Sequence, residues 1–320
     1  MKHHTPMAHR HQRPAGFLLG GKPDFGDWRK CLDRLDGSYS PHTLLSYRSD
    51  FGSFETWCKG RDLKYLPATP ETVAAYISAE TERLKPSTLK RKLAGIRKIH
   101  YLLRLRDPTY DVDVDLAMRR ARRLKPQRPS QALGVTAVLR DRLLAATTDN
   151  LSGLRDRALV SVGFDTLCRR GELVALHFED IEPNHFSTAS LLIRRAKNDP
   201  EGAGRIAHLT PGALEALMQW IEAAQIEGGP LFRPVYGKFA IDRFMNPIAL
   251  TRILKKLATR AGFTAEEVFG ISGHSLRVGA AQQLTINGVQ LLPIMRAGGW
   301  RSMNVVARYV ENVDINVWGS

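Results

Sequence analysis

The sequence predicts a mainly α-helical fold of two domains, with one small β-sheet in the second domain. Length is the first observation, because 320 residues can form two separate hydrophobic cores. The second is periodicity: apolar residues recur at three- and four-residue steps along most of the chain, as amphipathic helices require. The third is a break in this pattern at residues 124–134, LKPQRPSQALG, where two prolines favour a linker.

These patterns divide the chain into four parts. Residues 1–24 are rich in His, Pro and Gly and lack periodicity, which predicts a mobile tail. We expect a helical, basic domain at 25–125, a linker at 126–134 and a second domain at 135–320. The tail contains four histidines, but their irregular spacing and the lack of Cys or acidic partners do not favour a metal site.

Three helices of the first domain begin at recognisable caps. Ser40-Pro41 and Thr69-Pro70 place a hydroxyl N-cap before a proline at the first helical position, and Ser87 is expected to cap a third helix. An apolar stripe follows each cap and should face the core: Leu44, Tyr47, Phe51, Phe54 and Trp57, then Val73, Tyr76 and Ile77, then Leu89, Leu93, Ile96 and Leu103, and in a fourth helix Leu116, Ala117 and Met118.

The second domain combines helices with one hairpin. An apolar helix is expected at 154–164. Residues 190–195 and 205–209 flank the turn-rich NDPEGAG, a pattern typical of a β-hairpin. Thr210-Pro211 and Asn246-Pro247 open further helices, whose inward residues should be Leu214, Leu217, Met218 and Ile221 in one and Ile253, Leu254 and Leu257 in the other.

The charge indicates a polyanionic partner. The net charge is +15 and the pI is near 10, and nucleic acid is the most common polyanion inside a cell. The excess is concentrated, since residues 85–128 hold fourteen Lys and Arg against four Asp. On the third helix Lys90, Arg91, Arg97 and Lys98 lie largely off the apolar stripe and form a basic face. A solvated helix surface is the alternative interpretation.

Several classes of protein are disfavoured by what the sequence lacks. No apolar run approaches the roughly 18 residues of a membrane helix, and the N-terminal residues contain no apolar segment of a secretory signal. Three cysteines without a C-x-x-C pattern suggest neither a disulfide framework nor a zinc site. We therefore expect a reduced, cytoplasmic protein associated with the nucleoid.

The motifs of metal- and nucleotide-dependent enzymes are also missing. DVDVD at 111–115 imitates the start of a calcium loop, but Leu116 stands at position six and Arg122 at position twelve, where glycine and glutamate are required. No P-loop, H-E-x-x-H or G-x-S-x-G sequence occurs. Chemistry on DNA would therefore proceed without a metal, ATP or another cofactor.

Three segments carry residues suited to metal-free cleavage of a DNA phosphodiester. Such a reaction needs a nucleophile, cations for the non-bridging oxygens and an acid for the leaving 5′-oxygen. Arginine suits the second role because its planar fork matches two phosphate oxygens. The segments are TLCRRGELVAL at 166–176, SGHSLRVGAA at 272–281 and AGGWRSMNVVARYVEN at 297–312.

In this order and spacing the three segments resemble the catalytic boxes of tyrosine recombinases of the phage-integrase family. TWCKGRDLKYLPATPE at 56–71 and LAMRRARR at 116–123 are similar to the DNA-clamping domain of that family, so the resemblance covers about residues 40–312. It implies a helical SAM-like core-binding domain and an α+β integrase catalytic domain. It also implies a site-specific recombinase that acts through a 3′-phosphotyrosine intermediate and a Holliday junction.

The resemblance implies a catalytic set, in chain order Arg169, Glu172, Lys197, His274, Arg277, Trp300 and Tyr309. Tyr309 attacks the scissile phosphate, and Arg169 and Arg277 hold the non-bridging oxygens. Of two adjacent arginines, the register selects Arg169 rather than Arg170. A phenol ordinarily has a pKa of about 10, so this cationic pocket has to favour deprotonation of the tyrosine.

The remaining members of the set support these steps. His274 takes the tyrosine proton or orients the phosphate. Trp300 stands where many relatives have histidine and donates its indole N–H. Lys197, on the hairpin, protonates the 5′-oxygen, and Glu172 orients its neighbours. Taken singly, each has an ordinary structural interpretation as a core aromatic, a cap or a surface charge.

The expected DNA contacts form a second set: Arg91, Arg119, Arg120, Arg122, Arg123 and Arg252. Arg91 and Arg252 match family positions that reach bases, whereas the four arginines of 119–123 suit phosphate contacts. The implied partner is double-stranded DNA with an inverted-repeat site, held in a C-shaped clamp formed by the two domains. A homodimer would bind each site and a homotetramer would form in synapsis, with no membrane involved.

Some alternatives stay open at this point. Only eleven residues follow Tyr309, so Val317 and Trp318 are the candidates for a short peptide that docks into a neighbouring subunit. A type IB-like topoisomerase would share the chemistry but relax supercoils as a monomer, and a non-enzymatic DNA-binding regulator would form no covalent species. The residues do not reveal the target sequence, the directionality or the task, whether integration, excision or dimer resolution.

Overall fold

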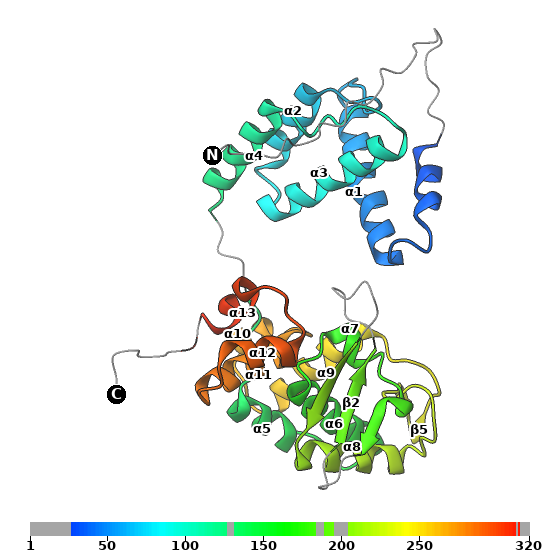
Figure 1. Ribbon diagram of the computed structural model, residues 1–320, viewed down its shortest axis with the longest axis vertical. Helices are drawn as coiled ribbons and strands as arrows, with labels where there is room; N and C mark the ends of the chain where they lie inside the picture. The colour runs from blue at the N-terminus through cyan, green and yellow to red at the C-terminus, as the bar shows by residue number, and fades with distance from the viewer. Residues whose placement is uncertain (1–26, 127–130, 184–188, 195–203, 312, 314–320) are drawn as a thin grey trace, which may run out of the picture. The chain divides into compact units, whose positions relative to one another are not determined.

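The computed structural model describes residues 27–126, 131–183, 189–194, 204–311 and 313 (Figure 1). The chain divides into two compact units, residues 1–128 and 129–320. Each unit has a hydrophobic core of its own. The expected fold class, mainly α with small sheets in the second unit, is confirmed. The tail at 1–24 and the docking candidates Val317 and Trp318 lie outside the described residues.

The first unit consists of helices: η1 (Trp28–Leu35), α1 (Pro41–Lys59), α2 (Pro70–Glu80), α3 (Pro86–Leu102) and α4 (Val112–Leu124). The Ser40 and Thr69 side chains accept hydrogen bonds from the backbone of Thr43 and Thr72, as expected of N-caps. The cap expected at Ser87 is wrong. Helix α3 begins at Pro86 after Lys85, because a proline with fixed φ fits the first helical position.

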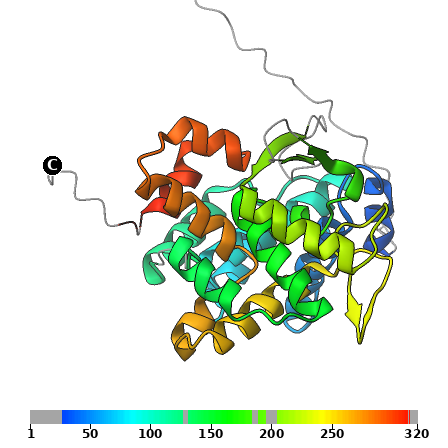
Figure 2. The same cartoon turned by 90° about the horizontal axis from the view of Figure 1, so that it is seen from below.

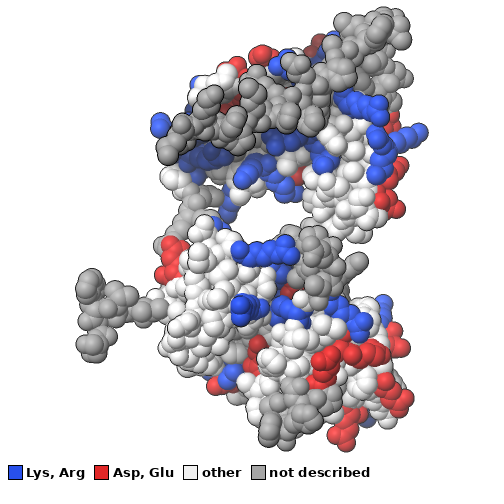
Figure 3. All heavy atoms as spheres, in the orientation of Figure 1, with Lys and Arg blue, Asp and Glu red and all other residues white. Residues whose placement is uncertain are grey.

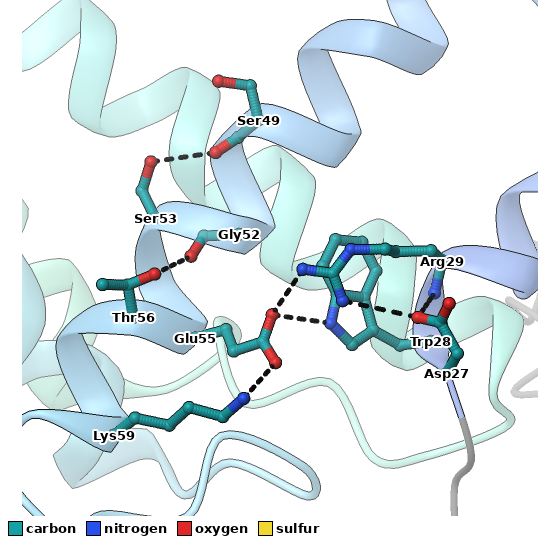
Figure 4. Close-up of polar contacts among 9 residues, drawn as sticks. All are labelled: Asp27, Trp28, Arg29, Ser49, Gly52, Ser53, Glu55, Thr56 and Lys59. Carbon is teal, nitrogen blue, oxygen red and sulfur yellow. Dashed lines mark hydrogen bonds and ion pairs between the residues drawn. The ribbon is translucent and has the colours of Figure 1, made fainter.

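A buried carboxylate fastens η1 to α1. Trp28, 2% exposed, packs edge-on against Phe51 with ring centroids 4.7 Å apart. Its indole Nε1 donates to Glu55 Oε2 at 2.9 Å, and Arg29 and Lys59 complete the coordination of that carboxylate (Figure 4). These three donors lower the pKa of Glu55 although burial, the largest single influence, raises it. Glu55 therefore stays ionised inside the unit.

The second unit begins with α5 (Ala137–Ala145), α6 (Leu151–Asp165), α7 (Arg170–Leu173) and η2 (Phe178–Asp180). Its antiparallel sheet has the order β1 (Ile181–Pro183), β2 (Ala189–Ile193) and β3 (Arg205–Leu209), with Ala189 opposite Leu209. The expected hairpin is thus confirmed, and β1 extends it by one strand. Helix α6 packs against β3, as does α8 (Pro211–Ala223) (Figure 1).

The remaining elements are β4 (Val235–Tyr236), β5 (Phe239–Ala240), α9 (Pro247–Arg260), α10 (Ala265–Gly270), α11 (Ser275–Ile286), α12 (Leu291–Gly298) and α13 (Met303–Val310). Figure 2 shows the orange-to-red helices α11, α12 and α13 gathered on one side of this unit, away from the yellow β4–β5 hairpin. None of the described helices is both long and apolar enough to cross a membrane.

Two expected core positions are wrong. Met218 is 49% exposed and Leu116 is 41% exposed. On α8 the buried residues are Ala213, Ala216, Leu217, Trp220 and Ile221. They follow three- and four-residue steps, and Met218 lies about 100° away from Leu217 around the helix, on the solvent side.

Candidate active site

Three stretches of the second unit converge on a small apolar cluster. The cluster joins the end of α6 and the loop after it (Phe164 and Leu167) to α11 (Ala280 and Ala281) and to the α12–α13 region (Ile294, Trp300 and Val306), with Tyr309 packed against it. The three sequence segments selected as candidate catalytic boxes therefore meet at one place. Helix α11 packs against α6, α12 and α13, and this packing brings the three segments together.

Tyr309 and His274 form the centre of this site. The Tyr309 hydroxyl lies 3.1 Å from His274 Nε2, and the two rings meet edge-on. Tyr309 occupies the last turn of α13, three residues after the fully buried Val306. Burial lowers the pKa of His274, and the charges of Arg277 and Arg169 lower it further. A neutral imidazole in this position can accept the phenolic proton.

Arg277 lies against the ring of Trp300. It is 1% exposed, and its guanidinium carbon lies 4.0 Å from the centroid of the Trp300 ring. Nη1 donates to the carbonyl of Leu167 and Nη2 to that of Gly298, at 2.7 Å for the latter. The buried Nε has no hydrogen-bond partner among the described residues. Burial, with Arg169 nearby, lowers the pKa of Arg277 to about 10, so the group remains charged at neutral pH.

Trp300 is placed by the two glycines before it. Its ring is 7% exposed and its centroid lies 5.6 Å from that of Tyr309. A Cβ on Gly298 would lie 2.0 Å from the indole ring, so a side chain there would displace Trp300. Gly299 ends α12 with φ of 64°, a conformation that favours glycine.

Arg169 is oriented by Glu172. Its Nη1 donates to Glu172 Oε1 at 2.5 Å, while its backbone N–H donates to Oε2 at 2.9 Å. The Arg169 side chain is 19% exposed. Arg170 is exposed, and its aliphatic stem lies against Gly273. The two adjacent arginines therefore differ: the structure directs Arg169 to the buried carboxylate and Arg170 to the surface.

Arg205 is a site residue that the sequence analysis missed. Its Nη1 donates to the carbonyl of Ala297 at 2.7 Å and its Nη2 to that of Thr166 at 2.8 Å, so one side chain ties the end of α6 to the end of α12. Glu172 lies 3.9 Å away. A signal was present, because strand alternation places Arg205 on the same face as the buried Ala207 and Leu209.

The other expected residues lie elsewhere or outside the described residues. Lys197 falls in the latter group. Arg252 is exposed on α9, and the four arginines of 119–123 are exposed on α4. In Figure 3 many Lys and Arg side chains of the first unit gather along its lower edge. Asp111, from the calcium-like motif, is the N-cap of α4 and accepts from the backbone of Asp113 at 3.0 Å.

Arg91 differs from the other expected DNA contacts because it has a buried partner. Its side chain is 53% exposed on α3, and its Nη2 lies 3.0 Å from Oδ1 of Asp50, whose own side chain is 1% exposed. Helices α1 and α3 approach closely there, since a Cβ on Gly95 would lie 3.0 Å from the Asp50 Cβ. Burial raises the pKa of Asp50, while Arg91 and Lys92 oppose that shift.

Comparison with known proteins shows the family to which the sequence is similar. The family model described as phage integrase family matches residues 138–314, and that of the phage integrase N-terminal SAM-like domain matches residues 34–107. An integrase/recombinase XerD homolog of Selenomonas ruminantium is 32% identical over 302 residues, covering 89% of this chain and 86% of the relative. The Cre recombinase of Escherichia phage P1 is 28% identical over 300 residues, covering 87% and 86%.

Solved structures share the fold. An integrase of transposon Tn1549 in complex with circular intermediate DNA matches with a TM-score of 0.63 at 12% identity, covering 88% of this chain and 94% of that one. A lambda integrase dimer bound to a COC′ core site matches with a TM-score of 0.59 at 14% identity, covering 92% and 78%.

Proposed function

The chain belongs to the phage integrase family of tyrosine recombinases, and we propose that it cleaves and rejoins DNA at a specific site with Tyr309 as its nucleophile. The observation that carries the nucleophile assignment is the 3.1 Å contact between the Tyr309 hydroxyl and His274 Nε2, beside a buried arginine and an indole. The topoisomerase and regulator alternatives are not favoured by these relatives.

The first chemical step transfers the phenolic proton to His274 and forms a bond between the phenolate oxygen and phosphorus. The bond from phosphorus to the 5′-oxygen breaks, Lys197 gives that oxygen its proton, and a 3′-phosphotyrosine remains. In the second step a 5′-hydroxyl from another strand gives its proton to Lys197 and attacks phosphorus, the bond from phosphorus to Tyr309 breaks, and the phenolate recovers its proton from His274. The ester retains the energy of the original bond, so strand exchange needs no ATP.

Two arginines stabilise the negative charge that gathers on the non-bridging oxygens. Arg169 is partly exposed and already directed by Glu172, so a phosphate can approach it. Arg277 is 1% exposed, and the Trp300 ring that lies over it has to shift before a phosphate oxygen can reach its guanidinium. Loading of DNA is thus coupled to a rearrangement of the aromatic layer.

The assembly proposed from the family is a homodimer on each inverted-repeat DNA site and a homotetramer when two sites synapse, joined through a four-way junction. A protein with this task acts at the nucleoid. Analytical ultracentrifugation of the protein with DNA that carries one or two candidate sites measures both stoichiometries. A monomer that relaxes supercoiled DNA without synapsis would contradict the assembly.

The nucleophile is tested by trapping the covalent intermediate. Nicked duplexes prepared from the DNA that flanks the coding region should give an SDS-resistant adduct with the wild-type protein and none with Tyr309→Phe. Mapping the cleaved phosphates then identifies the target. An adduct of undiminished yield with Tyr309→Phe would overturn the assignment.

A further inference from the structure

Two glutamine side chains hold the backbone carbonyl of the proposed nucleophile. Gln131 Nε2 donates to the Tyr309 carbonyl at 3.0 Å, and Gln282 Nε2 donates to the same oxygen at 3.1 Å. Gln131 belongs to the first described segment of the second unit, and Gln282 belongs to α11. Two donors from separate parts of the fold therefore converge on one atom of Tyr309.

The carbonyl they hold is one that the helix itself leaves open. The last carbonyls of a helix have no intrahelical donor. In a continued helix the N–H of Val313 would reach the Tyr309 carbonyl, but it donates to the carbonyl of Val310 instead, at 2.9 Å. The end of α13 is therefore fastened by side chains from elsewhere in the unit.

Helix α13 buries few of its own residues where it packs on α11 and α12. Of its eight residues, only Val306 is buried, while Tyr309 and Val310 are half-buried. A short helix with one core residue can rock about that residue, and such a motion would carry the Tyr309 hydroxyl away from His274. The hydrogen bonds from Gln131 and Gln282 to the Tyr309 carbonyl oppose this motion, because they hold the backbone of the residue that carries the phenol.

The two donors are themselves held firmly. Gln282 is 8% exposed, and a Cβ on Gly134 would lie 1.9 Å from its Oε1. The side-chain amide of Gln282 therefore occupies space that is open only because residue 134 is glycine. The segment that carries Gln131 is pinned to α11: Val135 N–H donates to the carbonyl of Ser275 at 2.9 Å, and Ala137 N–H donates to Gln283 Oε1 at 3.0 Å.

From this geometry we propose that Gln131 and Gln282 are positioning residues, which set the aim of Tyr309 by holding its backbone carbonyl. The inference rests on the proposed function of Tyr309. It assigns neither residue a contact with DNA or with the reacting atoms. Their effect is on the fraction of molecules in which the phenol lies on His274.

The test replaces each amide by a side chain of similar length that cannot donate. Gln131→Met and Gln282→Met should each slow single-turnover formation of the covalent adduct by about three- to tenfold, and the double variant by about ten- to a hundredfold. The dissociation constant for the same DNA should stay within about twofold, because phosphate contacts dominate affinity. Gly134→Ala should reproduce the Gln282→Met defect without removing the amide.

Gln219→Met is the matched control, since Gln219 is an exposed glutamine of α8 in the same unit whose amide donates to Glu215 on its own helix at 3.3 Å. It should cleave at the wild-type rate. Backbone hydrogen exchange gives a readout that does not depend on activity: amides of residues 303–311 should exchange faster in Gln131→Met and Gln282→Met, and those of α11 should not.

The outcomes separate the two ideas. Wild-type cleavage and wild-type exchange of 303–311 in the double variant would overturn the positioning role and leave the nucleophile intact. An equal loss in Gln219→Met would overturn it as well, because the effect would then not depend on a contact with Tyr309. An adduct that persists in Tyr309→Phe would instead refute the proposed function, whatever the glutamine variants do.

Discussion

The arginines of the two units differ in how far their side chains are exposed to solvent. On α4 the side chains of Arg119, Arg120, Arg122 and Arg123 are exposed, and Arg119 is paired with Asp115 one turn earlier at 2.8 Å. In the second unit Arg169, Arg205 and Arg277 are 19%, 10% and 1% exposed, and Glu172 or backbone carbonyls direct them. Exposed arginines attract a polyanion without fixing its position, whereas buried arginines have a geometry that cannot change cheaply. On the proposed function, the exposed arginines of α4 would hold DNA and the directed arginines of the second unit would serve its cleavage.

The largest effect should come from separating the adjacent arginines 169 and 170. Arg169→Ala should slow cleavage of bound DNA by about 100-fold or more, because it removes a preorganised cation from the phosphate site. Arg170→Ala is the control, and it should cleave at close to the wild-type rate. Single-turnover adduct formation and DNA affinity, measured together, check both. Reversed effects would mean that the register is shifted by one residue.

Arg205 should matter for stability as much as for activity. Arg205→Met leaves the carbonyls of Thr166 and Ala297 without this donor and should lower the free energy of unfolding by about 2–4 kcal/mol. Urea denaturation measures the change. Arg169→Ala leaves the carboxylate of Glu172 with the Arg169 backbone N–H and with Arg205, so it should cost less, about 1–2 kcal/mol, in the same assay. Equal losses would erase the distinction between these two arginines.

Burial lowers the pKa of His274 below its ordinary value of about 6.5, and the charges of Arg277 and Arg169 lower it further. The proposed base is the neutral form, so the cleavage rate should hold its plateau as pH falls through 6.5 and drop about tenfold per pH unit only below the lowered pKa. In Arg169→Ala the drop should begin at higher pH. A rate already falling at pH 7 in the wild-type protein would contradict His274 as the base.

Arg91 is the intermediate case, an exposed arginine with a buried acid behind it. Asp50→Asn keeps the shape of the side chain and removes the charge that directs Arg91. Its stability cost should be small, since burial raises the pKa of Asp50 and its charged form is already disfavoured. If Arg91 reads guanine, preference for that base at one position should fall about five- to tenfold. Competition binding over a library of sites measures this preference, with Arg91→Lys as the comparison.

The smallest effects are expected on α4. Arg122→Ala and Arg123→Ala should each reduce the slope of log affinity against log salt by about 0.9, weaken binding to all sequences alike and leave the cleavage rate of bound DNA unchanged. Arg119→Ala should change the slope less, because Asp115 already neutralises part of its charge. Salt titrations on specific and unrelated duplexes provide the measurement, and a sequence-dependent loss would assign these residues to base contacts.

Local signals predicted most of the helix starts, because a capping hydroxyl before proline acts within four residues, as at Ser40 and Thr69. These signals failed at α3, where two neighbouring residues could each precede the helix. The hydroxyl of Ser87 favoured one start, but the helix begins at Pro86 after Lys85. Strands of two or three residues, such as β1 and β4, are too short to carry a periodic pattern. The meeting of Tyr309 and His274 could be predicted from the segments that carry them.

The contacts that hold the site together were not accessible in this way. Arg205 reaches Ala297 across 92 positions of the chain, and Gln131 reaches Tyr309 across 178. Nothing in the composition around a glutamine or a strand arginine indicates such a partner. Pairings of this kind depend on tertiary packing, which brings α11, α12 and α13 to one place.

Tyr309 meets His274 and Trp300, and the Trp300 ring lies against Arg277, all within a single polypeptide. In the proposed assembly each subunit would therefore cut with its own Tyr309 and borrow no tyrosine from a neighbour. When intact and Tyr309→Phe subunits are mixed on one pair of sites, a defective member silences the strand it holds and no other. Such mixtures accumulate DNA broken in one strand, and the fraction of broken strands follows the fraction of intact protein linearly.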